Sequence, residues 1–189
     1  LPLVAPKVGD AWGDGVIFVV GEVTGYDEST FSFITNVTGI NAYRGRMVAS
    51  KSLGKLAWCE KEAQGANLSV GASDENNGRE NMVALENFIE LNNDKLENYP
   101  AFIACRGLGD GWYFPAYNEI RCVVANKDML NTKISEQEGV EISIEVYSSS
   151  TEVLRDKKCT DNAGYKYEIG DYNSTKISTI SEVRAVRAY

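Results

Sequence analysis

The order of the periodic segments along the chain limits the fold more than any other feature. Residues 16–20 (VIFVV) form a β-branched and aromatic run typical of a buried strand, and residues 183–189 (VRAVRAY) alternate small or apolar side chains with arginine. Between these runs, apolar side chains recur at helical spacing from Asn81 onward: Met82, Leu85, Phe88 and Ile89. Strands at both ends with helices between them favour an α+β fold over alternating βαβ units.

Further strands and connections follow from local patterns. We expect strands over residues 30–37 and 46–49. We also expect a half-buried strand over residues 140–147, where apolar and polar residues alternate. We interpret residues 50–78 as a long irregular connection with at most one helical turn, and residues 148–162 as a polar loop.

Two more helices and a turn complete the expected elements. Pro100 suits the first turn of a helix over residues 101–106. A further helix carries one apolar stripe formed by Ile120, Val123, Val124 and Lys127. Gly109–Gly111 is expected to form a turn, and residues 112–115 an extended segment, since the residue before a proline avoids the helical region.

Length and charge limit the function classes. The chain has 189 residues, and we expect an extended lead-in over residues 1–8 and a single domain over residues 9–189. It begins at Leu1 without a methionine, so we expect a chain whose leader has been removed. No apolar run approaches the ~20 residues that cross a bilayer, which predicts no membrane insertion. A formal net charge of −8 argues against nucleic acid as a partner.

The residue types exclude several reaction classes. Histidine is absent, which removes the usual general base, the Ser-His and Cys-His nucleophile pairs and histidine metal sites. The cysteines are widely spaced and form no C-x-x-C pair: Cys59, Cys105, Cys122 and Cys159. If all of them pair, ~3 disulfide connectivities are open, and we favour buried free thiols over two disulfides.

Four short motifs, taken in order, carry a family resemblance. They are DGVIF at residues 14–18, GLGDGWYFPAYNE at 107–119, YSSSTE at 147–152 and VRAVRAY at 183–189. Together they resemble the Lcl C-terminal domain family, a bacterial surface-protein module formerly described as a domain of unknown function. The resemblance implies a C-type-lectin-like α+β fold with a mixed or antiparallel sheet, in which the first and last strands pair and the termini lie close together.

The motifs depart from the family pattern at two positions. Ala116 replaces the serine that usually follows the proline, so we expect the helix N-cap to shift to Asn118, and Ser148 replaces a tryptophan. The remaining motif residues are interpreted as structural, with Arg184 and Arg187 in ion pairs on a sheet face. The family is more distantly similar to formylglycine-generating sulfatase-modifying enzymes, which use a cysteine pair close in space. The cysteines here match no local motif of those enzymes, so their activity is not carried over.

Metal and cofactor chemistry has no specific motif in this chain. The sugar-binding motifs of calcium-dependent lectins, E-P-N, Q-P-D and W-N-D, are absent. A polar stretch holds oxygen ligands that could suit calcium, but we interpret it as a solvated acidic loop: Glu152, Asp156, Asp161 and Asn162. We therefore predict no metal, no cofactor and no enzymatic activity. Two cysteine sulfurs within bonding reach at the floor of an open cleft would instead favour an enzyme.

The predicted contact surface is the polar region over residues 148–173. Tyrosines beside hydrogen-bonding side chains suit sugar or protein surfaces, because the ring stacks and the hydroxyl forms hydrogen bonds. The candidate ligand-binding residues are Glu152, Asp161, Asn162, Tyr165 and Tyr172. Loops on rigid scaffolds are where binding groups gather, which favours this region.

The resemblance implies a bacterial domain located outside the cell or on its surface, and the residue types predict that it is non-catalytic. We expect it to bind a glycan or a host or matrix protein, as part of a larger surface protein or assembly. The net charge of −8 argues against sulfated glycans. Two alternatives stay open: a formylglycine-generating or other enzyme, and a purely structural module of a surface or fimbrial assembly.

Overall fold

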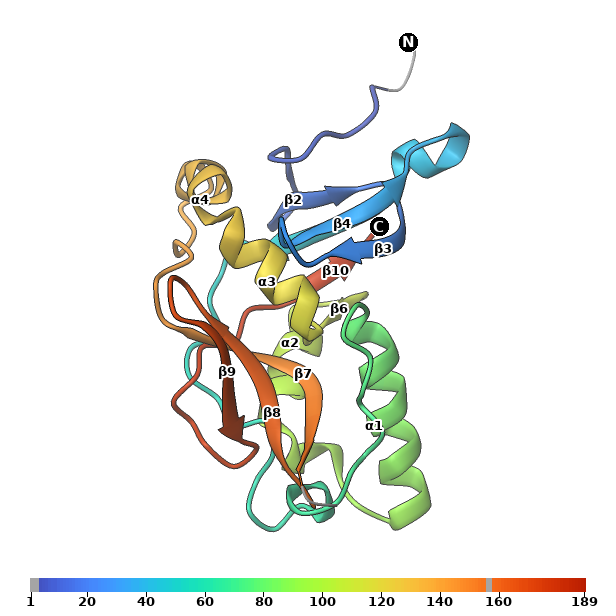
Figure 1. Cartoon of the computed structure of the whole chain (residues 1–189), viewed down its shortest axis with the longest axis vertical. Helices are drawn as coiled ribbons and strands as arrows, with labels where there is room; N and C mark the ends of the chain where they lie inside the picture. Colours follow the sequence, from blue (N-terminus) through green and yellow to red (C-terminus); the bar gives the residue numbers. More distant parts are fainter. Residues whose placement is uncertain (1–3, 156–157) are drawn as a thin grey trace.

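The chain forms a mixed α+β structure of antiparallel sheets and helices (Figure 1). It is a computed structural model that describes residues 4–155 and 158–189. Its elements, in chain order, are β1 (Ala11–Trp12), β2 (Gly15–Val20), β3 (Glu22–Asp27), β4 (Ser32–Asn36), β5 (Gly45–Ala49), α1 (Gly78–Asn92), α2 (Pro100–Arg106), β6 (Trp112–Tyr113), α3 (Tyr117–Ala125), α4 (Lys127–Glu136), β7 (Val146–Arg155), β8 (Lys158–Lys166), β9 (Gly170–Thr175) and β10 (Val186–Ala188). Short 3-10 turns lie at Gly39–Tyr43, Gln64–Ala66 and Leu96–Asn98.

A five-stranded sheet in the order β1-β2-β5-β10-β6 joins the two ends of the chain. Direct pairing of residues 16–20 with residues 183–189 was expected, and this is wrong, because β5 lies between β2 and β10 and pairs with both. Every residue of β5 is buried, so its backbone groups need partners along both edges, which the centre of a sheet provides. The two end segments nevertheless share one sheet, and the ring of Tyr189 lies 5.0 Å from that of Trp12.

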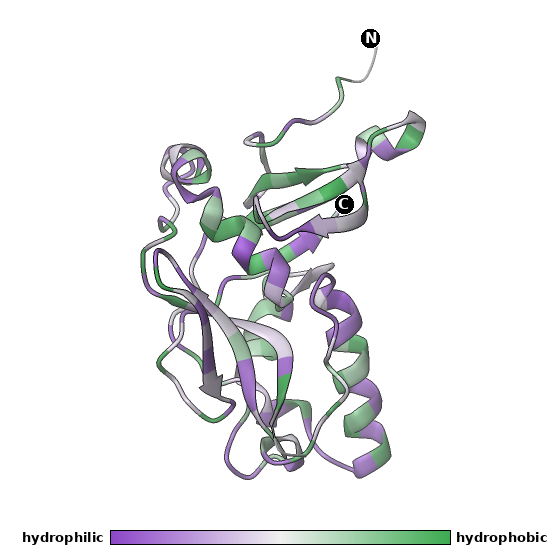
Figure 2. Cartoon of the chain, in the orientation of Figure 1, coloured by the Kyte–Doolittle hydropathy of each residue, from purple (hydrophilic) through white to green (hydrophobic). Residues whose placement is uncertain are grey.

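Side-chain alternation along β2 divides the core between the two faces of this sheet. Ile17 belongs to one buried cluster, which also holds residues of α1 and α2, whereas Val16 and Phe18 belong to a second cluster with residues of α3 and α4. Figure 2 shows β2 as hydrophobic and α1 as banded with polar and apolar residues. The sheet is therefore a central layer with helices packed on both faces.

The expected helices are present, but one of them is divided into two helices. Helix α1 carries the expected stripe, with Met82 and Leu85 buried. The helix expected to include Lys127 is broken at Asn126 into α3 and α4. The shift of the N-cap to Asn118 is wrong, because the carboxylate of Glu119 accepts the N–H of Ala116 and keeps the helix start there. Across residues 4–155 and 158–189, no helix has the length and apolar character needed to cross a membrane.

The strand expected over residues 140–147 exists only at its end, because β7 begins at Val146. Side chains occupy the backbone groups that a neighbouring strand would have paired. Arg184 donates to the carbonyls of Val140 and Glu141, and Asn131 bonds both the N–H and the carbonyl of Ile142. Side chains from two other parts of the chain thus hold this segment in place.

The segment interpreted as a polar loop, residues 148–162, instead belongs largely to the antiparallel sheet β7-β8-β9. The loop interpretation is wrong because small polar side chains are buried here with hydrogen-bond partners: Ser148, Ser149, Ser150, Thr151 and Asn162. Asp156 of the candidate calcium ligands lies outside the described residues, as do residues 1–3 of the expected lead-in.

The hairpin β3-β4 forms a separate two-stranded sheet, and its side chains contact α3 through Arg121 and β8 through Tyr165. Arg121 of α3 joins them. Its guanidinium lies 4.5 Å from the ring centre of Phe31 and 5.0 Å from that of Tyr117, and it forms a 2.6 Å ion pair with Glu28. This one side chain connects the tip of the hairpin to the body of the domain.

Candidate functional site

The predicted contact residues lie on the β7-β8-β9 sheet, and the structure brings only some of them together. Glu152 is opposite Asn162 in the register of β7 and β8, whereas Asp161 is opposite Val153. Tyr172 lies on β9, opposite Gly164. Asn162 and Tyr165 are buried, and so is the side chain of Glu152, whereas Asp161 and Tyr172 are half-exposed.

Glu152 belongs to a buried charge cluster with Lys176. The ammonium of Lys176 lies 2.5 Å from the Glu152 carboxylate and 4.6 Å from the ring centre of Trp58. It also donates to the carbonyls of Gly65 and Leu68. The carboxylate accepts the backbone N–H groups of Val70, Gly71 and Ala72. Both charges are therefore satisfied inside the protein, where they fasten the irregular connection before α1 to β7.

Asn162 and Tyr165 also make interior contacts. The Asn162 amide donates to the Ser148 hydroxyl at 2.6 Å and accepts from Ser174. The ring of Tyr165 lies 5.8 Å from that of Phe31. Asp161 accepts from Thr160 at 3.2 Å. These contacts give three of the five predicted residues supporting roles in the fold, and whether Asp161 and Tyr172 contact a ligand stays a prediction.

All four cysteines are free and buried, which confirms the expectation of free thiols. Burial raises the pKa of Cys59 and of Cys122 to about 12, and it also raises the pKa of Cys105 and Cys159. A thiol with a raised pKa stays protonated near neutral pH and is a weak nucleophile. Within the described ranges, no group of three or more Cys, Asp or Glu side chains is placed to hold a metal ion.

Arg184, expected in an ion pair on a sheet face, is instead buried against carbonyl groups. Its guanidinium donates to the carbonyls of Ala49, Ser50, Val140 and Glu141. Burial lowers the pKa of Arg184, and the neighbouring Tyr147 and Glu182 oppose that effect. The Arg184 guanidinium therefore bonds the carbonyls at the end of β5 and those of the segment beside it, which are not paired as two strands. It is not available to a ligand.

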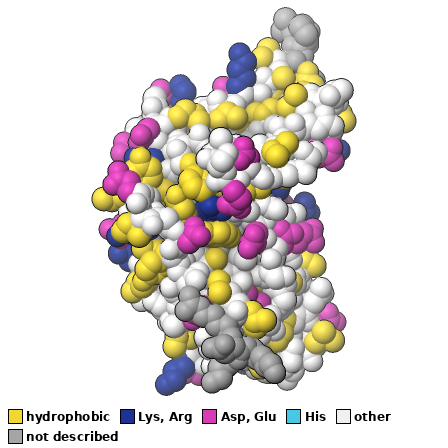
Figure 3. Space-filling view, in the orientation of Figure 1, with side chains coloured by type: hydrophobic (Ala, Val, Ile, Leu, Met, Phe, Trp, Pro, Cys, Tyr) yellow, Lys and Arg dark blue, Asp and Glu magenta, His cyan; other side chains and the backbone are white. Residues whose placement is uncertain are grey.

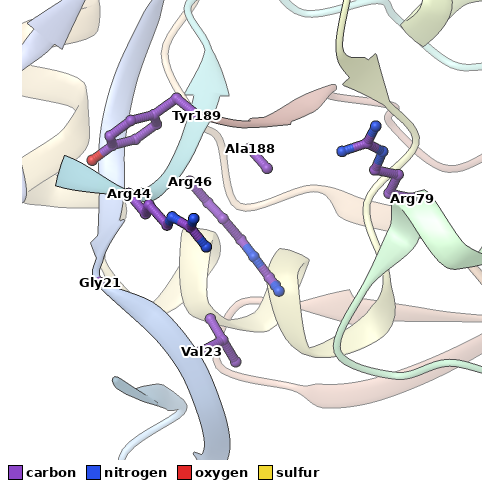
Figure 4. Close-up of a pocket in the computed structure, with 8 residues that line it drawn as sticks. Gly21, Val23, Arg44, Arg46, Arg79, Ala188 and Tyr189 are labelled. Atoms are coloured by element: carbon purple, nitrogen blue, oxygen red, sulfur yellow. The ribbon is translucent and has the colours of Figure 1, made fainter. Parts of the chain in front are cut away.

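An open pocket lined by arginines lies elsewhere, between the start of β3, the start of β5, the start of α1 and the end of β10 (Figure 4). Its volume is about 370 Å³. Figure 4 shows Arg44 and Arg46 on one side of this pocket and Arg79 on the other. Val23, Ala188 and Tyr189 complete the wall. Within the described part of the chain, no aspartate or glutamate lines the pocket.

The three arginines differ in their partners. Arg46 is buried, with an ion pair of 2.8 Å to Glu119 and its guanidinium 4.7 Å from the ring centre of Phe33. Glu119 is held in turn by the Tyr113 hydroxyl and by the N–H groups of Gly78 and Ala116. Arg44 and Arg79 are exposed, and neither forms an ion pair with any carboxylate of residues 4–155 and 158–189. The charge of Arg46 is thus neutralised by Glu119, whereas the charges of Arg44 and Arg79, at the edge of the pocket, have no ion-pair partner within the described residues.

A second hollow of about 470 Å³ shares Arg79 with this pocket. Arg106 and Glu86 line it and form an ion pair of 2.9 Å, and Asp110 also lines it. The expected turn at Gly109–Gly111 is part of its wall. The second hollow therefore has carboxylates where the first has none.

Sequence reasoning missed the arginine pocket, although one signal was present. Arg46 lies on β5 and Arg44 lies in extended backbone just before it, and residues two apart in an extended segment point to the same side. A Cβ on Gly45 would collide with the carbonyl of Val19, so the close approach of β2 and β5 requires the glycine. Nothing in the sequence places Arg79 opposite this pair, because it lies on a helix more than 30 residues away.

Comparison with known proteins gives a likeness in fold and no match in sequence. The chain matches no protein-family model and no curated protein sequence, so the resemblance to the Lcl C-terminal domain is not confirmed. Its fold is similar to that of a fimbrial protein from Bacteroides ovatus. The TM-score is 0.60 at 16% sequence identity, and the match covers 100% of this chain but only 46% of the fimbrial protein. At this identity the likeness concerns the fold alone.

Proposed function

We propose that this chain is a non-catalytic module of a bacterial surface appendage. The observation that carries the proposal is the fold likeness over the whole chain to a fimbrial protein, at a TM-score of 0.60. Because that protein is about twice as long as the match, the module is part of a larger surface protein or assembly. This favours the structural alternative over a free-standing ligand-binding domain.

The absence of catalysis is part of the proposal, and the state of the polar groups supports it. The thiols are buried, and burial raises the pKa of each. Glu152 and Glu119, two carboxylates with buried side chains, are each held by several donors and one cation. Groups bound in this way support structure and have no proton or electron pair free for a substrate.

Two finer statements also belong to this proposal. A C-type-lectin-like arrangement is supported by the four ordered motifs and by the single sheet that contains both ends of the chain. Recognition of a glycan or of a host or matrix protein is supported by the half-exposed Asp161 and Tyr172 on the β7-β8-β9 sheet.

Localisation in the source bacterium tests the appendage assignment. An epitope inserted after Ile169, in the exposed turn between β8 and β9, leaves the paired strands intact. We expect an antibody to the epitope to label intact cells and to detect the chain in the filament fraction released by shearing. The same epitope on an abundant cytosolic protein is the control for cell integrity. Recovery of the chain only from the soluble interior of lysed cells would reject the proposal.

A further inference from the structure

We propose that the arginine pocket binds a sugar that carries a single carboxylate. The proposal rests on the pocket formed by Arg44, Arg46 and Arg79, which lies apart from the β7-β8-β9 contact surface predicted from the sequence. It concerns binding by the isolated chain, so it stands or falls independently of the appendage assignment.

Charge is the first support. The chain has 27 acidic and 19 basic residues, yet the described lining of this pocket holds three arginines and no carboxylate. Glu119 neutralises Arg46, which leaves Arg44 and Arg79 as two uncompensated positive charges on one cavity. An anion between them removes their mutual repulsion and gains charge-assisted hydrogen bonds from both.

The position of Arg79 is a second, independent support. It lies in the first turn of α1, where the helix dipole favours anions and disfavours cations. No ion pair within the described residues compensates for that cost. An arginine that opposes its local electrostatics and faces a cavity fits a binding role, since functional sites are where such local rules are broken.

Size and wall chemistry indicate a small ring rather than a bare ion. A volume of about 370 Å³ lies within the range of small-molecule sites, ~300–1,000 Å³. Val23, Ala188 and Tyr189 give an apolar wall beside the guanidinium groups. A guanidinium fork matches a planar carboxylate with two parallel hydrogen bonds, and an apolar and aromatic wall suits the face of a pyranose ring.

The surroundings favour one carboxylate over a polyanion. A chain of negative groups that extended past Arg79 would enter the second hollow, where it would meet Glu86 and Asp110. Figure 3 shows further acidic side chains across the middle of one face of the molecule. Because the Debye length is ~8 Å at physiological salt, the pocket attracts a nearby carboxylate while the rest of the surface repels extended polyanions.

Titration of the 189-residue chain with single sugars tests the proposal. Glucuronate and N-acetylneuraminate are the carboxylated probes, and glucose and N-acetylglucosamine are the neutral controls, with binding followed by NMR shifts or calorimetry. We expect both acids to bind at one site, with affinity that falls as salt rises, and the neutral sugars to bind at least about tenfold more weakly.

Variants locate the site. R44A and R79A are each expected to weaken acid-sugar binding at least about tenfold, and R44K and R79K are expected to weaken it as well, because a lysine keeps the charge but not the fork. R106A removes one exposed arginine of the second hollow and is the matched control, expected to bind as the parent chain does. Circular dichroism checks that each variant is folded.

Several outcomes would overturn the proposal. These are equal binding of neutral and acidic sugars, binding that survives the R44A/R79A double variant, an R106A effect as large as that of R44A, and no binding of either acid. Tighter binding of heparin or of a poly-glutamate peptide than of the single sugars would assign the pocket to a different class of ligand.

Discussion

The two charged regions of this domain use similar side chains for opposite purposes. In the interior cluster, Lys176 and Glu152 are almost fully buried and are satisfied by each other, by two carbonyls and by three backbone N–H groups. At the arginine pocket, Arg44 and Arg79 are exposed and face a cavity without a carboxylate. Burial and the number of partners, and not residue type, separate a supporting charge from one that is free to bind.

Arg46 links the two situations. It lines the pocket, but its ion pair with Glu119 and its contact with the Phe33 ring give it the environment of an interior charge. Because Tyr113 and the starts of α1 and α3 also contact Glu119, this pair fixes one side of the pocket to the central sheet and two helices. A rigid floor with free charges at the rim lowers the entropy that a ligand must overcome to bind.

The largest effect that tests this comparison is the loss of Lys176. Lys176→Met leaves the Glu152 carboxylate buried without its cation, which is expected to destabilise the fold by ~3–5 kcal/mol. Urea unfolding followed by tryptophan fluorescence measures the change. The matched control is Lys133→Met, which removes a surface partner of Glu136 and is expected to cost at most ~0.5 kcal/mol. A cost below ~1 kcal/mol for Lys176→Met would show that the cluster does not support the fold as described.

The next effect concerns Arg121, which is buried like Lys176 but has a partner, Glu28, that is 65% exposed. Arg121→Met removes the ion pair and the contacts with the Phe31 and Tyr117 rings, and is expected to cost ~2 kcal/mol. Hydrogen exchange is expected to accelerate in β3 and β4 before the rest of the domain. Glu28→Gln keeps the ring contacts and serves as the milder control. Uniform acceleration throughout the domain would contradict the connecting role of Arg121.

The sequence was sufficient where burial and periodicity agree. Residues 16–20 form a strand because they are continuously apolar and lie between glycines, and α1 forms because one of its faces is apolar. The order of strands, helices and strands gave the α+β class for the same reason. Direct pairing of the end strands could not be excluded, because pairing partners depend on where β5 is placed, and that placement is a property of the whole sheet.

The sequence was insufficient where polarity and burial disagree. The alternation over residues 140–145 resembles a strand, yet Arg184 and Asn131, both distant in sequence, occupy its backbone groups. Ser148 and Asn162 look like loop residues, yet they are buried because each finds the other as a hydrogen-bond partner. The arginine pocket was missed for the related reason that α1 places Arg79 opposite β5 only in the folded chain.

A smaller effect is expected from Asp94, a half-buried carboxylate between the two extremes. Partial burial alone raises its pKa, but the Tyr99 hydroxyl, the Asn98 amide and the N–H groups of Lys95 and Gln64 outweigh burial and hold the pKa below its ordinary value of 3.8. The ionised Asp94 carboxylate therefore contributes its full stabilisation above pH 3.8, the ordinary pKa that it has in the unfolded chain. This stabilisation is lost as the pH falls through the lower pKa that Asp94 has in the folded protein.

Asp94→Asn is expected to lower stability by ~1 kcal/mol at neutral pH, and by progressively less as the pH falls through the acid range. Urea unfolding of parent and variant at several pH values measures the difference. Tyr99→Phe removes one of the donors to Asp94 and is expected to reduce the pH dependence in part. A constant difference between parent and variant at every pH would show that the charge of Asp94 is not involved.

The smallest effect on stability is expected at the arginine pocket, where the largest effect on binding is proposed. Arg44→Ala is expected to change the free energy of unfolding by at most ~0.5 kcal/mol, because the side chain is exposed and has no ion pair within the described residues.

Arg79→Glu is expected to raise stability by ~0.3–0.5 kcal/mol, since a negative charge in the first turn of α1 complements the helix dipole. Thermal unfolding at low salt measures both. A side chain whose replacement stabilises the fold is not retained for stability. An Arg79→Glu variant that is more stable and no longer binds glucuronate would therefore show that Arg79 serves binding, whereas Lys176 supports the fold. A destabilised Arg79→Glu variant would place Arg79 among the supporting charges instead.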